Sequence, residues 1–226
     1  MGAAIKINNL TKTFVKDGLK IEVLKGINFA VSAGESLAVA GVSGAGKSTL
    51  IHIIGALDRP TSGSVLVDGV DVFNWEEKKL ARFRNEKIGF IFQFFNLLPE
   101  FTSLENTMMP ALLQGKSRRE ARKQAEIILN EVGLGDRMNH QPGELSGGEQ
   151  QRVAVARALI MKPGIILADE PTGNLDRSTG VKIEDILVNL NKTREVTLIV
   201  VTHNKSLADK MSRNIGLEDG RICSRE

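Results

Sequence analysis

The strongest constraint on the fold is a glycine-rich stretch at residues 41–48 with an apolar segment on each side. It fits the pattern G-x-x-x-x-G-K-[ST], follows a run at 36–40 that predicts a buried strand, and precedes a run at 49–54 that predicts a helix. Glycines let the backbone wrap around phosphate oxygens, and amides at a helix start point positive dipoles at them. Lys47 adds a charge for the β- and γ-phosphates, and the Ser48 hydroxyl can bind Mg²⁺. The candidate phosphate-binding residues are Gly41, Val42, Ser43, Gly44, Ala45, Gly46, Lys47, Ser48 and Thr49. An ordinary glycine-rich turn is the alternative, and the strand–loop–helix context disfavours it.

A second polar element stands at the end of another apolar run, where residues 165–168 lead into Asp169 and Glu170. Such a run is typical of a central parallel strand buried on both faces, and open α/β sheets bind ligands at the carboxyl ends of these strands. We expect Asp169 to hold Mg²⁺, directly or through water, and Glu170 to polarise an attacking water near the γ-phosphate. A solvated strand end is the alternative, and the acid pair would mean little without the phosphate-binding loop.

The third element is the hexapeptide Leu-Ser-Gly-Gly-Glu-Gln at residues 145–150, far downstream of the first loop. A helix predicted at Glu149–Met161 follows it, so Ser146, Gly147 and Gly148 would form a second helix N-terminus that attracts anions. An isolated helix cap is the alternative. The two motifs in this order indicate two halves of one composite ATP site.

Three further polar positions complete an ordered set. Gln93 follows the apolar run 88–92, Asn174-Leu175-Asp176 follows the acid pair, and His203 follows a strand predicted at Val196–Val201. Together with the elements above, they make the chain resemble the nucleotide-binding subunits of ABC transporters over essentially its whole length. Each position alone is weak, and the six elements in order are specific.

The resemblance implies a set of roles around ATP and Mg²⁺. Catalytic roles fall to Glu170, His203 and Gln93, metal binding to Ser48, Gln93 and Asp169, and nucleotide contacts to Asp176. Phe14 matches the family's adenine-stacking aromatic, which is more often Tyr; this chain has no Tyr. Stacking needs only the ring face, and plain core packing is the alternative for Phe14.

The resemblance also implies two chains packed head to tail. Each γ-phosphate would then lie between Lys47 of one chain and residues 146–148 of the other. The isolated surfaces are polar and glycine-rich, so we expect a monomer or weak dimer without ATP and a homodimer with it.

Further segments narrow the resemblance to the subfamily that drives lipoprotein-releasing and macrolide-export systems: 89–94, 97–102, 104–106 and 168–176. Within it, residues 139–142 and 56–58 are most similar to the lipoprotein-releasing ATPases. The function implied is an ATP-hydrolysing subunit, peripheral at the cytoplasmic face of a bacterial inner membrane, that powers lipoprotein release.

Alternatives stay open at this point. The same ATPase could serve macrolide or peptide export, or cell division. A soluble ATPase of DNA repair or translation usually carries a coiled-coil insertion or two fused ATPase domains, and this chain has neither. A nucleotide-gated binding module with negligible turnover is disfavoured by the intact Glu170 and His203.

Composition limits the partners. The net charge of +3 and the pI near 9.0 favour an anionic membrane surface slightly, but are too weak to argue for nucleic-acid binding. The one cysteine, Cys223, excludes an internal disulfide. The N-terminus lacks a charged-then-apolar targeting signal, and no apolar run reaches the roughly 20 residues of a membrane span. The chain therefore cannot be the channel of a transporter.

The pattern predicts one α/β domain over residues 1–226: a P-loop NTPase core with a mainly parallel sheet, an antiparallel β layer and an inserted helical subdomain. The antiparallel layer is expected at about 1–35, the core at 36–94 and 161–226, and the helical subdomain, which carries the hexapeptide, at 95–160.

Short strands are predicted at Ile5–Asn8, Ile21–Leu24 and Ile27–Val31, and a closing strand at Asn214–Leu217. Ser117 and Glu120 predict a capping box, and the apolar stripe after it favours subdomain core: Ala121, Ala125, Ile128, Leu129 and Val132.

Residues 94–101 are unusually apolar for a loop that leaves Gln93. Core packing of the helical subdomain explains part of this composition. We expect the dominant role of Phe94–Phe101 to be a groove that receives a short helix from a transmembrane permease subunit, with Gln93 linking that groove to the Mg²⁺ site.

Overall fold

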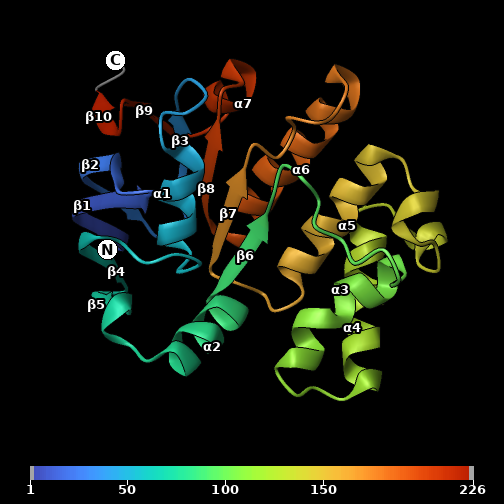
Figure 1. Ribbon diagram of the computed structural model, residues 1–226. Helices are drawn as coiled ribbons and strands as arrows, with labels where there is room; N and C mark the ends of the chain where they lie inside the picture. Colours follow the sequence, from blue (N-terminus) through green and yellow to red (C-terminus); the bar gives the residue numbers. More distant parts are fainter. Residues whose placement is uncertain (1–2, 224–226) are drawn as a thin grey trace.

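The computed structural model describes residues 3–223 and contains two β-sheets with helices packed around them (Figure 1). The smaller sheet has strand order β2-β1-β4-β5, and the larger has order β10-β9-β3-β8-β7-β6. The smaller sheet consists of β1 (Ala3–Lys16), β2 (Leu19–Ser32), β4 (Ser62–Val67) and β5 (Val70–Asp71). The larger sheet consists of β3 (Ser36–Ala40), β6 (Ile88–Ile91), β7 (Ile165–Asp169), β8 (Thr197–Thr202), β9 (Arg213–Glu218) and β10 (Arg221–Cys223).

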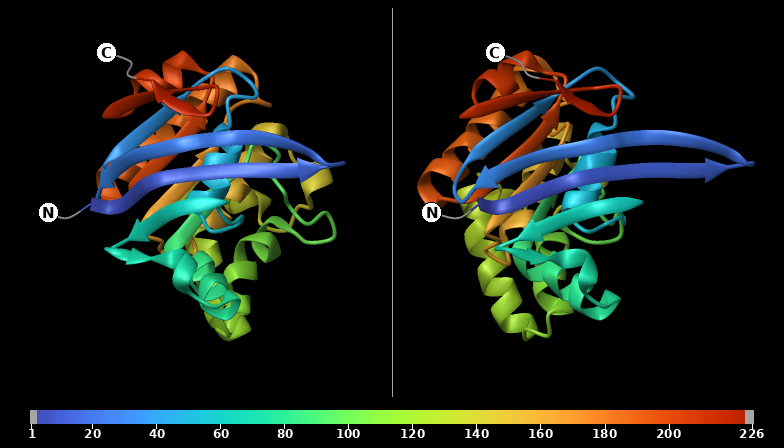
Figure 2. Two further views of the ribbon diagram at one scale, coloured as in Figure 1. Left: turned by 60° about the vertical axis from the view of Figure 1, so that its left-hand side comes forward. Right: turned by 90° about the vertical axis from the view of Figure 1, so that its left-hand side faces the viewer.

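The β1–β2 hairpin projects well beyond the body of the molecule (Figure 2). Its turn is formed by Asp17 and Gly18, and both residues have positive φ, as a tight two-residue hairpin turn requires. The prediction of short separate strands was wrong, because each strand runs for 14 residues through register shifts such as the one between Ile7 and Leu10. Asn9 has φ of 44° within that shift, and such bulges interrupt the polar–apolar alternation.

The antiparallel layer also extends past its predicted limit at residue 35. β4 pairs with β1, so residues that the sequence analysis placed in the P-loop core belong to the antiparallel sheet. Gly63 makes this pairing possible, since a Cβ there would lie 2.6 Å from the Asn8 carbonyl oxygen.

The core of the larger sheet is parallel and buried on both faces, as predicted. Alternate residues of each strand enter opposite apolar clusters: Ala168 and Val200 join the cluster on one side, and Leu167 and Val201 join the other. The surrounding helices are α1 (Lys47–Ile54), α2 (Glu77–Lys87), α6 (Arg177–Arg194) and α7 (Lys205–Asp209). Of these helices, α2 was not predicted from the sequence.

The helical subdomain contains α3 (Ser103–Leu113), α4 (Arg118–Glu131) and α5 (Gly147–Leu159). All three helices begin with a capping box, in which Thr102, Ser117 and Ser146 pair with a glutamate three residues later. The expected capping box at Ser117 is confirmed, and the apolar stripe that follows it is buried in the subdomain core. No helix among residues 3–223 is both long and apolar enough to cross a membrane.

Gly55 ends α1 where this helix packs against the sheet. A methyl group at this position would overlap the Phe90 ring and lie 2.8 Å from Leu167 Cδ1. We expect Gly55→Ala to lower the free energy of unfolding by about 1–3 kcal/mol, the usual effect of overpacking a core. Urea denaturation measures this loss. Gly164→Ala is the matched control, because a Cβ at Gly164 meets no atom within 4 Å. Equal stability of the two variants would contradict the packing described here.

Candidate functional site

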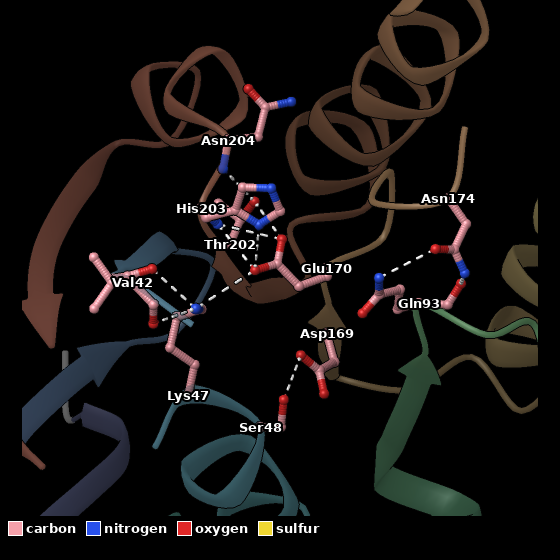
Figure 3. Close-up of polar contacts among 11 residues, drawn as sticks. Val42, Lys47, Ser48, Gln93, Asp169, Glu170, Asn174, Thr202, His203 and Asn204 are labelled. Atoms are coloured by element: carbon pink, nitrogen blue, oxygen red, sulfur yellow. Dashed lines mark hydrogen bonds and ion pairs between the residues drawn. The ribbon is translucent and has the colours of Figure 1, made fainter. Parts of the chain in front are cut away.

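The candidate site lies at the carboxyl edge of the parallel sheet, where three strands end side by side (Figure 3). β3, β8 and β7 are paired in register, with Ala40 opposite Thr202 and Asp169 opposite Val201. The loop after β3, the acid pair of β7 and the residues after β8 therefore converge. A cavity of about 540 Å³ opens between them, and its lining includes Ser43, Lys47, Gln93, Glu170 and His203.

The loop of residues 41–46 curves tightly before α1. Gly44 and Gly46 have φ of 82° and 100°, in the left-handed region that favours glycine. A Cβ at Gly46 would lie 2.9 Å from the Val23 carbonyl oxygen, so β2 packs directly on this loop. Gly46 is the N-cap of α1, whose N-terminus faces the cavity and can attract phosphate oxygens.

Lys47 is buried at the base of the cavity, with a relative exposure of 7%. Its Nζ donates to the carbonyl oxygens of Gly41 at 2.9 Å and Val42 at 3.0 Å, and lies 3.6 Å from Glu170 Oε1. The ammonium thus has partners on the protein in this form. A phosphate group entering the loop would have to replace them.

Ser48 and Asp169 form a pair of oxygen ligands beside the loop. Ser48 Oγ donates to Asp169 Oδ1 at 3.1 Å, and His52 Nε2 lies 3.9 Å from Asp169 Oδ2. Burial raises the pKa of the Asp169 carboxyl, opposed by the Ser48 hydrogen bond and nearby positive charge. A hydroxyl and a carboxylate are ligands that Mg²⁺ accepts. Residues 3–223 contain no cluster of three or more His, Cys, Asp or Glu side chains suited to a metal, so this pair would need phosphate oxygens or water as further ligands.

Glu170 is the most constrained residue of the site. It has φ of 44°, an unusual conformation for glutamate, and is 9% exposed. Thr202 Oγ1 donates to Oε2 at 3.0 Å, the His203 amide donates to Oε1 at 3.0 Å, and His203 Nδ1 lies 2.9 Å from Oε1. These contacts fix the carboxylate next to the cavity that Lys47 lines.

Gln93 enters the site from the end of β6 and contacts the loop after β7. Its Nε2 donates to Asn174 Oδ1 at 3.1 Å, and Asn174 Nδ2 donates back to the Gln93 carbonyl oxygen at 3.0 Å. Figure 3 shows the Gln93 amide nitrogen directed at Asn174 and draws no polar contact from Gln93 to Ser48 or Asp169. Its roles in metal binding and catalysis stay predictions.

The hexapeptide forms the N-terminus of α5, as predicted. Ser146 is the N-cap, and its Oγ and backbone amide donate to Glu149 Oε2 at 2.7 and 2.8 Å. These bonds, with the Arg137 guanidinium 3.1 Å away, lower the pKa of Glu149 to about 2. Ser146, Gly147 and Gly148 are not among the residues that line the cavity above Lys47. One chain therefore does not bring the two anion-binding helix ends together.

Two other predicted residues lie outside the cavity lining. Asp176 caps α6 and accepts from the amides of Ser178 and Thr179. Hydrogen bonds from the side chains of Thr179 and Ser178, with these amides, hold the pKa of its carboxyl far below the usual range. Phe14 lies on the hairpin with 41% of its surface exposed, and Lys12 Nζ is 4.7 Å from its ring centre. This exposure rules out core packing for Phe14, whose ring carries the Lys12 ammonium over one face.

A second cavity, of about 490 Å³, separates the sheet from the helical subdomain. We name it the α2–α3 groove. Its walls come mainly from α2, β6 and the ends of α3 and α5, and Asn96 is the one residue of 94–101 in its lining. That Phe94–Phe101 receive a helix of a permease subunit stays a prediction. The loop borders the α2–α3 groove and is held by Arg157, which donates to the carbonyl oxygens of Phe95 and Asn96.

Sequence reasoning missed the residues that orient the acid pair. Thr202 is fully buried and bridges Glu170 to the amide of Asn204, and Asn204 caps α7. The signal available in the sequence was the polar triplet at residues 202–204, which directly follows the apolar residues of β8. His52 stands four residues after Ser48 on α1, so helical spacing alone places both on one face.

Comparison with known proteins shows the family to which the chain is similar. The family model described as ABC transporter matches residues 24–173. The chain is 68% identical over 220 residues to the lipoprotein-releasing system ATP-binding protein LolD of Syntrophus aciditrophicus, covering 97% of this chain and 99% of that protein. It is 54% identical to the protein of the same name from Geobacter metallireducens, covering 99% of this chain and 100% of the relative.

Solved structures show the same architecture. A dimeric structure of MJ0796, a bacterial ABC transporter cassette, is similar with a TM-score of 0.91 and 44% identity, covering 98% of this chain and 97% of that one. A post-hydrolysis dimer of the same cassette, bound to ADP and Pi, has a TM-score of 0.91 and 43% identity over the same shares of the two chains.

Burial of the Asp169 charge leads to a stability prediction. A carboxyl whose pKa is higher in the folded than in the unfolded chain destabilises the fold once it ionises, so stability is lost as pH rises from the ordinary pKa through the folded one. Asp169→Asn should therefore raise the Tm of the nucleotide-free chain at pH 7 and weaken its stabilisation by MgATP. Calorimetry with and without MgATP measures both effects. The exposed Asp136→Asn is the control; a lower Tm for Asp169→Asn at neutral pH would contradict the argument.

Proposed function

The chain belongs to the ABC transporter family and is an ATPase of the ABC type, and we propose that it powers the release of lipoproteins from a bacterial inner membrane. The observation that carries the proposal is the 68% identity to a lipoprotein-releasing system ATP-binding protein over 97% of the chain. Export or cell-division roles have no comparable support. The chain acts as a single ATPase unit, peripheral to the membrane at its cytoplasmic face.

The phosphate half of the ATP site is formed by residues 41–49. Backbone amides of this loop and the N-terminus of α1 bind the phosphates, and the Lys47 ammonium leaves the carbonyls of Gly41 and Val42 to pair with them. Ser48 and Asp169 hold Mg²⁺, which neutralises phosphate charge when bound. Phe14 stacks on the adenine, and its exposed ring supports this role.

Glu170 is the general base of hydrolysis. Thr202 and the His203 amide orient its carboxylate, so one oxygen can accept a proton from the attacking water. The His203 side chain is 66% exposed beside it and contacts the γ-phosphate and the water. Gln93, paired with Asn174, joins the catalytic site to the α2–α3 groove and changes partner when MgATP binds.

The second half of the site comes from another copy of the chain. Ser146, Gly147 and Gly148 begin α5 outside the cavity that Lys47 lines, so they bind the γ-phosphate held by the partner's loop. Asp176, at the start of α6, contacts the nucleotide across the same interface. Both solved structures of MJ0796 are dimers, which supports this arrangement.

A permease subunit docks in the α2–α3 groove. The groove is lined by apolar side chains such as Leu57, Phe90 and Leu113, with Arg84 and Arg157 among them, and suits the end of an amphipathic helix. The groove lies between the larger sheet and the helical subdomain. A movement of the helical subdomain, or the binding of nucleotide, would therefore change the shape of the groove.

Replacing the general base tests the catalytic assignment. Glu170→Gln should retain ATP binding and reduce turnover by roughly 10²–10⁴-fold, because an amide cannot accept the proton. An ATP-bound dimer should also accumulate, since hydrolysis no longer separates the chains. A coupled ATPase assay and size-exclusion chromatography measure these effects. Turnover within about threefold of the parent would remove Glu170 from this role.

Ser146→Arg tests the two-chain site. The added bulk and charge should block dimerisation with ATP and cut turnover strongly, while the monomer still binds ATP because Lys47 is intact. Normal dimerisation and hydrolysis would refute the composite site.

Mixing Ser146→Arg with Lys47→Ala sharpens the test. In that heterodimer one composite site carries both changes and the other carries neither, so ATPase activity should return if one intact site suffices. The Ser146→Arg variant alone, at the same total protein concentration, is the control.

A further inference from the structure

The outer face of α2 carries aromatic and cationic side chains around a shallow cavity. We name it the α2 basic face and define it by Trp75, Lys78, Lys79, Arg82, Phe83 and Lys87. The cavity has a volume of about 530 Å³, and Glu76 and Glu86 complete its lining. None of these residues belongs to the ATP site or to the α2–α3 groove.

The charge of this face is positive. Its four cationic side chains outnumber the two carboxylates, and Glu86 is already paired with Arg82 at 2.7 Å. Within residues 3–223, Lys78, Lys79 and Lys87 form no ion pair with a carboxylate. All three lysines are exposed. Their charges are available to an anionic partner.

The floor of the cavity is aromatic. The Trp75 and Phe83 rings meet edge to face with centroids 5.6 Å apart, and Lys79 Nζ lies 4.3 Å from the Trp75 ring centre. An apolar floor with a cationic rim matches a ligand that has an anionic group next to an apolar region. Tryptophan with lysine or arginine is the combination that occurs at membrane–water interfaces.

The position of α2 brings this face beside the α2–α3 groove. Ala81, Arg84 and Asn85 line the groove from one side of the helix, and the basic face occupies the next side. Gln114, just after α3, donates to Glu86 at 3.1 Å and ties the two groove walls together. The turn between α3 and α4 and the start of α4 lie at the same end of the molecule as α2 (Figure 1) and carry three more cations: Lys116 in the turn, and Arg118 and Arg119 on α4.

We propose that the α2 basic face binds anionic phospholipid headgroups on the membrane surface, with Trp75 at the level of the headgroups and the lysines paired with their phosphates. The proposal rests on the proposed function for one point, that the α2–α3 groove faces a membrane-embedded permease. A chain docked through the groove then presents the adjacent face of α2 to the bilayer. This contact would hold and orient the ATPase beneath the permease independently of nucleotide.

The chain offers a direct optical test, because Trp75 is its single tryptophan and it has no tyrosine. The purified full chain is titrated with vesicles of pure phosphatidylcholine and with vesicles that contain phosphatidylglycerol. Trp75 emission should shift to the blue only with the anionic vesicles, and brominated acyl chains should quench it. The shift should reverse as salt is raised, since the attraction is electrostatic.

Neutralising two lysines identifies the surface. Lys78→Gln with Lys79→Gln should weaken binding to the anionic vesicles by roughly 25-fold, at about fivefold for each lysine. Lys182→Gln with Lys192→Gln makes the same charge change on α6 and should leave binding within about twofold. ATPase activity of both variants should equal that of the parent, so failure of lipid binding is distinguishable from failure of the proposed ATPase. Equal binding by the two double variants, binding without a change in Trp75 emission, or equal binding to both kinds of vesicle would each overturn the proposal.

Discussion

The register of the parallel sheet is the constraint on which the site depends. β3, β8 and β7 pair so that their last residues lie at one edge, and each strand delivers a different group there. β3 leads into the phosphate-binding loop, β7 ends in Asp169 and Glu170, and β8 leads into His203. A slip of one residue in any pairing would turn every side chain of that strand to the opposite face. The buried cores on both sides of the sheet hold the register, so core packing and catalytic geometry are linked.

Charge balance then determines what the site can do before nucleotide binds. Lys47 is buried and contacts two carbonyl oxygens and Glu170, while Asp169 is partly buried beside Ser48 and its carboxyl has a raised pKa. Phosphate and Mg²⁺ together would supply the missing charge for both groups. The N-terminus of α5 shows the same principle, since Glu149 satisfies Ser146 in this form and a phosphate would compete for that hydroxyl. In both halves of the site, the groups that would bind phosphate already have hydrogen-bond partners within the protein. ATP binding would replace these partners with phosphate oxygens.

Most of the site could be predicted from sequence because its chemistry is contiguous: residues 41–48, the acid pair and the hexapeptide each lie within one segment. The hydrophobic periodicity also predicted the parallel strands and the apolar stripe of α4. What failed depends on contacts between distant segments. Bulges at positions such as Asn9 hid the continuity of the hairpin, and the pairing of β4 with β1 leaves no local signal. The α2–α3 groove is lined by α2, β6, α3 and α5, which are far apart in the sequence, so no single segment predicts it. The bond from Thr202 to Glu170 joins two strands and could be found only in three dimensions.

The central claim is that ATP completes a site shared by two chains, and hydrogen–deuterium exchange tests it most directly. Exchange is followed in residues 41–49 and 145–150 with a non-hydrolysable ATP analogue and Mg²⁺, over a range of protein concentrations. The analogue should protect residues 41–49 at every protein concentration, whereas protection of residues 145–150 should appear with nucleotide and grow as the protein concentration rises. Protection of 145–150 that is absent throughout, or that does not depend on protein concentration, would contradict it.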